Sequence, residues 1–194
     1  DVEDRWTPAA DGPQVRVRWY RPSDRAEPVA ALLWIHGGGY VLGFPEQDER
    51  LVLSIVAELG IAVATVDYRL APEHPHPAPL DDCHAVLRWL HDQAQGLGVR
   101  PDRIAVGGAS AGGGLAAALT LLAHDRGEAA QLAGGGEQEL VGEQRGGRVV
   151  DEVAQAREGG AEAVEEEGAR EVVVAATVGL EGAPAGRGDG EEVL

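Results

Sequence analysis

A serine between two glycines, at the point where a buried strand meets a helix, is the feature that most constrains the fold of this chain. The apolar stretch 103–107 leads into Gly-Ala-Ser-Ala-Gly, and an Ala- and Leu-rich helical pattern follows to residue 125. A serine on such a sharp turn has a strained backbone, and small neighbours avoid clashes there. The turn lifts the hydroxyl out of the sheet, beside the free amides of the helix N-terminus. We therefore expect Ser110 to be a catalytic nucleophile supported by Gly108 and Gly112.

An ordinary glycine-rich loop is the alternative interpretation of this motif, because Gly-x-Ser-x-Gly also arises by chance in a chain with 28 glycines. A loop of that kind often binds phosphate. This one has no Lys and does not match the spacing of a phosphate-binding P-loop. The strand before the motif and the helix after it favour the nucleophile.

Apolar runs and helical patterns alternate along the first 130 residues. Continuous apolar runs at 29–35 and 61–67 are typical of buried parallel strands, and 14–20 alternates like a strand with one exposed face. Helical spacing covers residues 46–59 and 81–95, and a glycine follows each stretch. This order predicts an α/β fold, in which the chain supplies the N-terminal portion of a doubly wound sheet.

Three consecutive glycines, Gly37, Gly38 and Gly39, come directly after the first of these buried strands. Glycines let the backbone approach a ligand closely, so that several amides can point at one oxygen. Together with the amide of Ala111, they would form an oxyanion hole for the tetrahedral intermediate of acyl transfer. The preceding His36 is either a catalytic base or a residue that orients this loop, and we favour the second role.

A proline-rich segment at 67–77 follows the next buried strand and predicts an irregular but ordered loop. Arg69 and Glu73 are expected to pair and brace it. His74 and His76 could suggest a metal site, but two histidines without further ligands are weak evidence. We therefore expect a scaffold role for this segment and no metal site.

Three segments of the chain, HGGGY, DYRLAPEHPHPAPLDD and GASAGGG, occur in the order and approximate spacing of a known family. Over about residues 11–130 the chain resembles the hormone-sensitive lipase-like family of α/β hydrolases, also called the GDXG lipolytic or acetyl-esterase family. The resemblance implies hydrolysis of carboxylic esters through an acyl-serine, with no cofactor. It implies Ser110 as nucleophile and an oxyanion hole of Gly37, Gly38, Gly39 and Ala111. The residues expected in structural support are His36, Tyr68, Arg69, Glu73, Gly108 and Gly112.

The remainder of the family's catalytic triad has no clear counterpart in this chain. In the family an acid and then a histidine follow the serine, more than a hundred residues further on. Here His124 is the one histidine after Ser110, and in a continuous helix it would lie about 21 Å away along the axis. We therefore expect the chain as given to be inactive. The alternative is a non-catalytic protein of the same fold that binds small molecules.

Composition changes near residue 130. Residues 131–194 contain no aromatic residue and no His, and they carry 15 acidic residues against five Arg. We expect residues 1–130 to form a partial α/β-hydrolase domain and 131–194 to be a Glu/Gly/Ala-rich acidic tail. The tail would be poorly ordered or read out of frame, with a helix over 148–156 or 161–174 or a strand over 171–178 as its elements.

Charge and cysteine content narrow the classes of partner. The formal net charge of −17 disfavours binding to nucleic acid or to an anionic membrane. No apolar run reaches membrane-spanning length, and the single cysteine, Cys83, cannot form an internal disulfide. We expect a cytoplasmic protein whose partner is a small-molecule ester. The sequence does not determine the oligomeric state.

Overall fold

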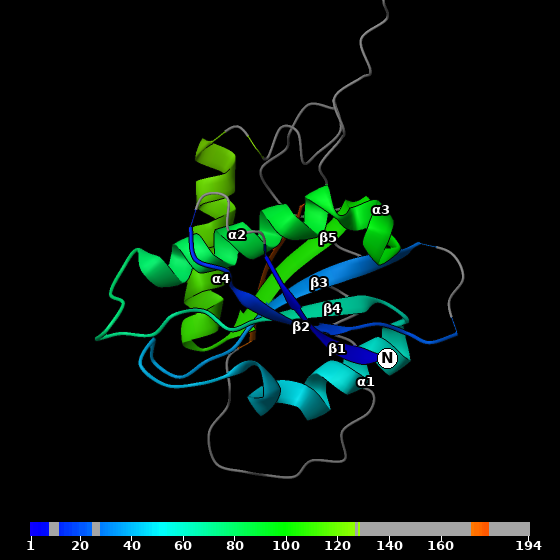
Figure 1. The fold of residues 1–194 in the computed structure, drawn as a ribbon, viewed down its shortest axis with the longest axis horizontal. Helices are drawn as coiled ribbons and strands as arrows, with labels where there is room; N and C mark the ends of the chain where they lie inside the picture. Colours follow the sequence, from blue (N-terminus) through cyan, green and yellow to red (C-terminus); the bar gives the residue numbers. More distant parts are fainter. Residues whose placement is uncertain (8–11, 25–27, 127, 129–171, 179–194) are drawn as a thin grey trace, which may run out of the picture.

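The computed structural model describes residues 1–7, 12–24, 28–126, 128 and 172–178, and these residues form a mixed sheet with helices on both faces (Figure 1). The strands are β1 (Val2–Trp6), β2 (Arg16–Tyr20), β3 (Val29–Ile35), β4 (Ala62–Val66), β5 (Val99–Ala109) and β6 (Val172–Val178). The helices are the 3₁₀ turn η1 (Pro45–Asp48), α1 (Glu49–Leu59), α2 (Ala78–Asp92), α3 (Ala94–Leu97) and α4 (Ala111–Asp125).

Strand order in the sheet is β1-β2-β4-β3-β5-β6. The three central strands, β4, β3 and β5, are mutually parallel, whereas β2 pairs antiparallel with β1 and β4, and β6 pairs antiparallel with β5. Parallel neighbours require crossover connections, and α1 and α2 provide them. Because these strands are parallel, β3 and β5 end at the same edge of the sheet, where the catalytic motifs begin.

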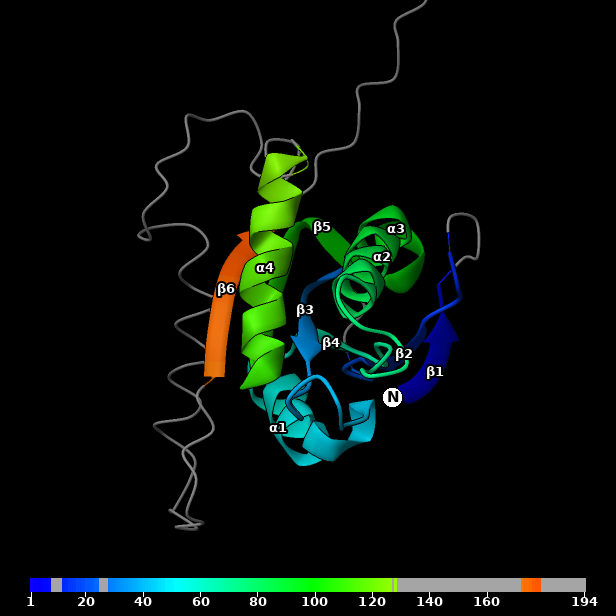
Figure 2. The ribbon, with the colours of Figure 1, turned by 90° about the vertical axis from the view of Figure 1, so that its left-hand side faces the viewer.

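Each face of the sheet has its own apolar core. Helix α1 covers one face through Val52 and Ile55, which pack with Trp34 of β3. Helices α2, α3 and α4 cover the other face, where Trp89 of α2 meets Trp19 of β2 edge to face at 6.4 Å between ring centroids. Figure 2 shows α4 lying alongside β5 and β6, and α1 on the opposite side of the sheet. This two-sided cover confirms the doubly wound α/β architecture expected from the sequence.

Several element boundaries follow the sequence pattern, and others differ for local reasons. Strand β3 and helix α4 have the bounds expected from the apolar runs. The expected helix over 46–59 begins with a 3₁₀ turn over Pro45–Asp48, and α1 follows it from Glu49. Strand β5 begins at Val99, four residues before the predicted position. Residues 100–103 are exposed and mostly charged, so they hide the strand pattern in the sequence.

The acidic tail expected over 131–194 lies outside the described residues except for β6. The strand considered for 171–178 is confirmed as β6, so a helix reaching residue 174 is wrong for its last three residues. Within the described ranges, no helix is long and apolar enough to cross a membrane.

Candidate active site

Ser110 stands at the junction of β5 and α4, as the residue that caps the N-terminus of α4. Its backbone has φ 51° and ψ −118°, and the residue is exposed. Positive φ is uncommon for a residue with a side chain, and it persists only where the surroundings fix it. The structure therefore holds Ser110 on a sharp turn that presents its hydroxyl to solvent.

The turn is fixed by contact between backbone atoms on both sides of Ser110. A Cβ atom added at Gly112 would clash with the carbonyl oxygen of Ile35, and one added at Gly108 would lie 2.5 Å from the carbonyl carbon of Gly112. The start of α4 is thus pressed against the end of β3. Both glycines occupy the supporting positions expected from the sequence, because no side chain fits at either.

The glycine loop after β3 lies directly against the serine turn. A Cβ atom on Gly37 would be 3.4 Å from Cβ of Ser110 and 2.9 Å from the carbonyl oxygen of Ala109. Gly38 has φ 124°, and its carbonyl accepts hydrogen bonds from Val41 N (3.2 Å) and Leu42 N (3.0 Å). This turn brings the backbone of the loop to the serine with no side chain between them.

Four backbone amides are the expected donors of the oxyanion hole. Outside the ladders of the sheet and helices, no hydrogen bond among the described residues uses the N–H groups of Gly37, Gly38, Gly39 or Ala111. The first amides of any helix also lack an intrahelical partner. Of the residues that the sequence suggested for an oxyanion hole, the structure places Gly37 against the serine turn and Ala111 directly after Ser110.

Hydrogen bonds from the side chains of His36 and Tyr68 hold the glycine loop in place. The imidazole Nδ1 of His36 donates to the carbonyl of Gly37 at 2.7 Å, and the Tyr68 hydroxyl donates to the carbonyl of His36 at 3.0 Å. The two rings stack with centroids 4.2 Å apart. In a trans peptide the N–H points opposite to the C=O, so fixing these two carbonyls also fixes the amides of Gly37 and Gly38.

The buried position of His36 determines its protonation state. Burial lowers the pKa of His36, and its Nε2 has no hydrogen-bond partner among the described residues. Nδ1 must carry the proton to donate to Gly37, so Nε2 of the neutral ring is unprotonated. The orienting role expected for His36 agrees with this arrangement, and its side chain is committed to the loop.

Gln47 and Asp48 are supporting residues that the sequence analysis missed. Asp48 is buried in η1 and accepts a hydrogen bond from the indole Nε1 of Trp34 at 3.0 Å. Gln47 Nε2 lies 3.5 Å from the carbonyl of Gly37. The clue in the sequence was their position a few residues after the three glycines. A loop that folds back on the preceding strand needs side chains that hydrogen-bond to it.

The expected pairing of Arg69 with Glu73 is wrong, because Arg69 pairs with Asp82. Both Nε and Nη2 of Arg69 donate to the Asp82 carboxylate at 2.8–3.1 Å, and the backbone N–H of Arg69 donates at 2.8 Å. Asp82 is buried in the first turns of α2, whereas Glu73 is exposed. Spacing of four residues brings side chains together on a helix, and residues 69–73 are not helical.

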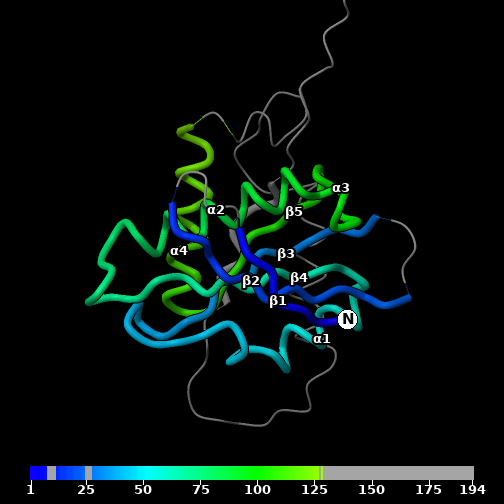
Figure 3. Tube along the Cα trace, in the orientation of Figure 1, coloured from blue at the N-terminus to red at the C-terminus, as the bar shows by residue number. Residues whose placement is uncertain are grey.

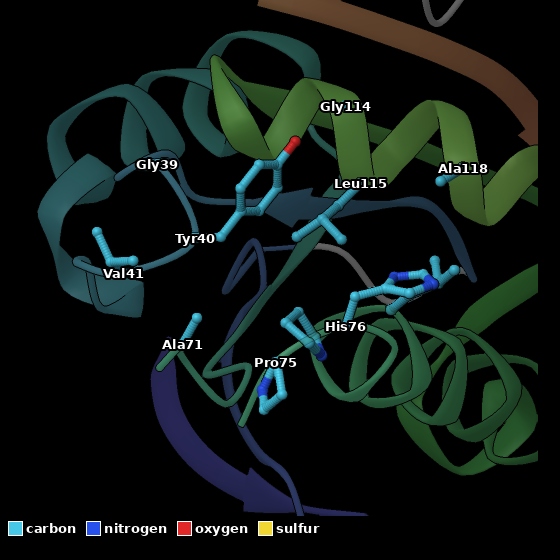
Figure 4. A pocket seen from close by; sticks show the side chains of 11 residues that line it. Gly39, Tyr40, Val41, Ala71, Pro75, His76, Gly114, Leu115 and Ala118 are labelled. Carbon is cyan, nitrogen blue, oxygen red and sulfur yellow. The ribbon is translucent and has the colours of Figure 1, made fainter. Parts of the chain in front are cut away.

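A cleft of about 390 Å³ opens beside the glycine loop (Figure 4). It is bounded by Gly39 and Tyr40, by the segment from Ala71 to Leu80, and by Leu115 on α4. The loops after β3 and after β4 leave the same end of the sheet (Figure 3). Residues of both loops line the cleft. Its walls are mostly apolar, as is typical of sites for small organic ligands.

A general base for Ser110 would be a side chain within hydrogen-bond reach of its hydroxyl. The Ser110 hydroxyl makes no hydrogen bond to a described side chain. His36 is committed to the loop, and His84 is hydrogen-bonded to Glu128 at 2.7 Å. His124 lies at the far end of α4, about 21 Å from Ser110 along the axis. Among the described residues there is also no group of three potential metal ligands.

The sequence of this chain is similar to those of known α/β hydrolases. Residues 32–158 match a family model described as the alpha/beta hydrolase fold. A carboxylic ester hydrolase of Mycobacterium tuberculosis is 42% identical over 128 residues, which are 65% of this chain and 33% of that protein. An ethyl acetate hydrolase of Pseudomonas putida is 42% identical over 125 residues, 63% of this chain and 38% of that protein.

The chain is also similar in structure to solved esterases. A bacterial heroin esterase aligns with a TM-score of 0.64 and 48% identity, covering 66% of this chain and 40% of that chain. The chain thus spans between about a third and two fifths of the length of these relatives.

Proposed function

Because the chain belongs to the hormone-sensitive lipase-like family of α/β hydrolases, we propose that its described residues form the nucleophile and oxyanion side of a carboxylic ester hydrolase. The observation that carries this proposal is the contact between the serine turn and the glycine loop. An exposed Ser110 with positive φ lies against Gly37, at 3.4 Å from the position of a Cβ there. An ester carbonyl bound at this junction meets a nucleophile and several amides at once.

The chemistry follows from these positions. Ser110 Oγ attacks the ester carbonyl carbon and its proton passes to a base, while the carbonyl oxygen becomes an oxyanion. The amides of Gly37, Gly38, Gly39 and Ala111 stabilise that oxyanion. Collapse of the intermediate breaks the bond to the alcohol, which takes the proton from the base, and leaves an acyl-serine. Attack by water then releases the carboxylic acid and restores the serine hydroxyl. Each lost amide donor typically costs about 10²–10³ in rate.

The proton from Ser110 needs an acceptor that the described residues do not supply. A serine without a base is a weak nucleophile, and triad-deficient enzymes keep only about 10³–10⁴-fold catalysis over water. We therefore propose that this chain by itself forms the acyl-serine slowly. The same observation favours, as a second candidate, a protein that binds small molecules in the apolar cleft without turnover.

Hydrolysis of p-nitrophenyl acetate by the purified chain tests these proposals. We expect slow release of p-nitrophenolate that is lost in Ser110→Ala and kept in Ser54→Ala, a matched control in which the serine lies on α1. Equal rates for wild type and Ser110→Ala would exclude Ser110 as nucleophile. Turnover in the usual range of about 1–10³ s⁻¹ would contradict the missing base.

Covalent labelling separates the two candidate functions. A p-nitrophenyl alkylphosphonate should modify Ser110 slowly, and peptide mass mapping should find the adduct on the peptide that contains it. Saturable ligand binding with no adduct on Ser110 would instead support the non-catalytic candidate.

A further inference from the structure

Tyr40 adopts an unusual position beside the cleft. It has φ 66°, which is uncommon for a residue with a side chain, and its carbonyl accepts a hydrogen bond from Ala71 N at 2.9 Å. This bond joins the glycine loop to the segment after β4. A strained conformation that is held in place in this way is a reason to look for a functional role.

The side chain of Tyr40 reaches across to α4. A Cβ atom at Gly114 would lie 2.7 Å from the Tyr40 hydroxyl oxygen, so the end of the ring rests directly on the backbone of the helix. Figure 4 shows the hydroxyl pointing toward Gly114, with Leu115 projecting into the cleft beside the ring. Gly114 is therefore the residue that allows the ring to lie this close to the helix.

The cleft and the nucleophile are neighbours. The amide of Gly114 donates to the carbonyl of Ser110 at 3.2 Å, so the wall of the cleft begins one helical turn, about 6 Å, from the serine. Gly39, one of the proposed oxyanion donors, also lines the cleft. Apart from Tyr40 and His76, the lining residues carry no polar side chain. A group attached to an ester bound at Ser110 would enter an apolar space.

We propose that Tyr40, held by Ala71 and packed on Gly114, is a specificity-determining residue that limits how bulky an apolar group can enter this cleft. The proposal rests on the proposed function, because the group in the cleft would belong to the ester. The volume of about 390 Å³ is at the low end for ligand pockets, which span about 300–1,000 Å³, so the width that the ring leaves open decides which shapes enter. Removing the ring opens the α4 side of the cleft.

Two isomeric alcohols measure this selectivity without any chemistry at Ser110. The probes are 1-hexanol and 3,3-dimethylbutan-1-ol, which have the same atoms and differ only in branching. Binding is followed by ¹H–¹⁵N NMR at the amides of Gly39, Gly114 and Ala118, which line the cleft. We expect the wild-type chain to bind 1-hexanol about tenfold more tightly than its branched isomer.

The variants test the ring and its contact with Gly114 separately. Tyr40→Gly suits the positive φ and removes the ring, and we expect the preference for the linear alcohol to fall about tenfold. Tyr40→Phe keeps the ring and should keep the preference. Gly114→Ala should displace the ring and weaken binding of 1-hexanol about tenfold. Phe44→Ala, an exposed aromatic on the same loop that does not line the cleft, is the matched control and should change nothing.

The outcomes decide the proposal independently of hydrolysis. An unchanged ratio in Tyr40→Gly, or shift changes away from the cleft amides, would overturn it. Failure of 1-hexanol to bind the wild-type chain would do the same. If Tyr40→Gly does not fold, Gly114→Ala decides the proposal. An unchanged affinity of that variant for 1-hexanol would contradict the role of the contact between Tyr40 and Gly114. Loss of Ser110 reactivity with retained selectivity would refute only the proposed hydrolase function.

Discussion

The two strand ends that meet at the candidate site are both closely packed, but only one of them also depends on side-chain hydrogen bonds. At the end of β5, the serine turn is fixed by the absence of side chains, since Gly108 and Gly112 pack directly on backbone atoms. At the end of β3, the glycine loop is fixed by side chains, since His36 and Tyr68 hold its carbonyls. Added atoms should therefore damage both regions, whereas lost hydrogen-bond donors should damage only the second.

The largest effect is expected from Gly112→Ala. Its Cβ would clash with the carbonyl oxygens of Ile35 and His36, which belong to backbone and cannot rotate away. We expect a loss of about 3 kcal/mol or more in the free energy of unfolding, measured by urea denaturation. Gly96→Ala, at a helical glycine with open space around it, is the control and should be neutral or stabilising by up to about 1 kcal/mol. Similar losses in both variants would contradict the tight packing at the turn.

Tyr68→Phe tests the donor-held side of the comparison. It removes the hydroxyl that donates to the carbonyl of His36 and leaves the stacked ring. We expect a loss of about 1–2 kcal/mol in unfolding free energy, because a buried carbonyl is left unpaired. The ¹⁵N shift of Gly37 should also move, since that amide shares a peptide group with the carbonyl. An unchanged Gly37 resonance would show that Tyr68 does not orient the loop.

The strain at Ser110 is measured by two variants that differ only in one methyl group. Ser110→Gly relieves the positive φ, whereas Ser110→Ala keeps it. After allowance for the freer unfolded chain of the glycine variant, we expect Ser110→Gly to be more stable by about 1 kcal/mol in urea denaturation. If Ser110→Ala proves the more stable, the turn is not strained in solution.

The smallest effect concerns pH. Burial lowers the pKa of His36 below its ordinary value of 6.5, so between the two values the unfolded chain binds a proton that the folded chain rejects. His36 therefore contributes stability above pH 6.5 that is lost as the pH falls toward its folded pKa. His36→Asn keeps a donor for Gly37 but does not titrate. Its loss of stability between neutral pH and about pH 5.5 should be smaller than that of the wild type, by less than about 1 kcal/mol in urea denaturation. Parallel pH profiles would exclude His36 as the titrating group.

The sequence predicted the elements whose patterns are local. Strand β3 and helix α4 have continuous apolar or helix-forming runs with glycines at their ends, and their bounds were confirmed. Strand β1 was missed, because three of its five residues are charged and it is an edge strand with mostly exposed side chains. Its position depends on antiparallel pairing with β2, which a single apolar pattern does not reveal.

The motifs of the candidate site could be predicted from the sequence, but the contacts between residues of different segments could not. Ser110 and the three glycines stand in patterns with a direct physical meaning, so the sequence placed them on the correct turns. The partner of Arg69 depends on where α2 begins relative to the preceding loop, and nearness in sequence pointed to Glu73 instead of Asp82. Tyr40 was visible beside the glycines, but its contact with Gly114 forms only when the glycine loop and α4 are assembled.

The hydrogen bond between Trp34 and Asp48 gives the chain an intrinsic optical probe. The indole is buried in the core between the sheet and α1, and it is hydrogen-bonded at 3.0 Å to Asp48, at the far end of the segment that begins at Gly37. Indole emission shifts to longer wavelength when water reaches the ring, so release of this segment should appear as a red shift in fluorescence. Phe substitutions at the other three tryptophans, Trp6, Trp19 and Trp89, would leave Trp34 as the reporter. Motion of the loop beside Ser110 can then be timed in a stopped-flow instrument with no added label.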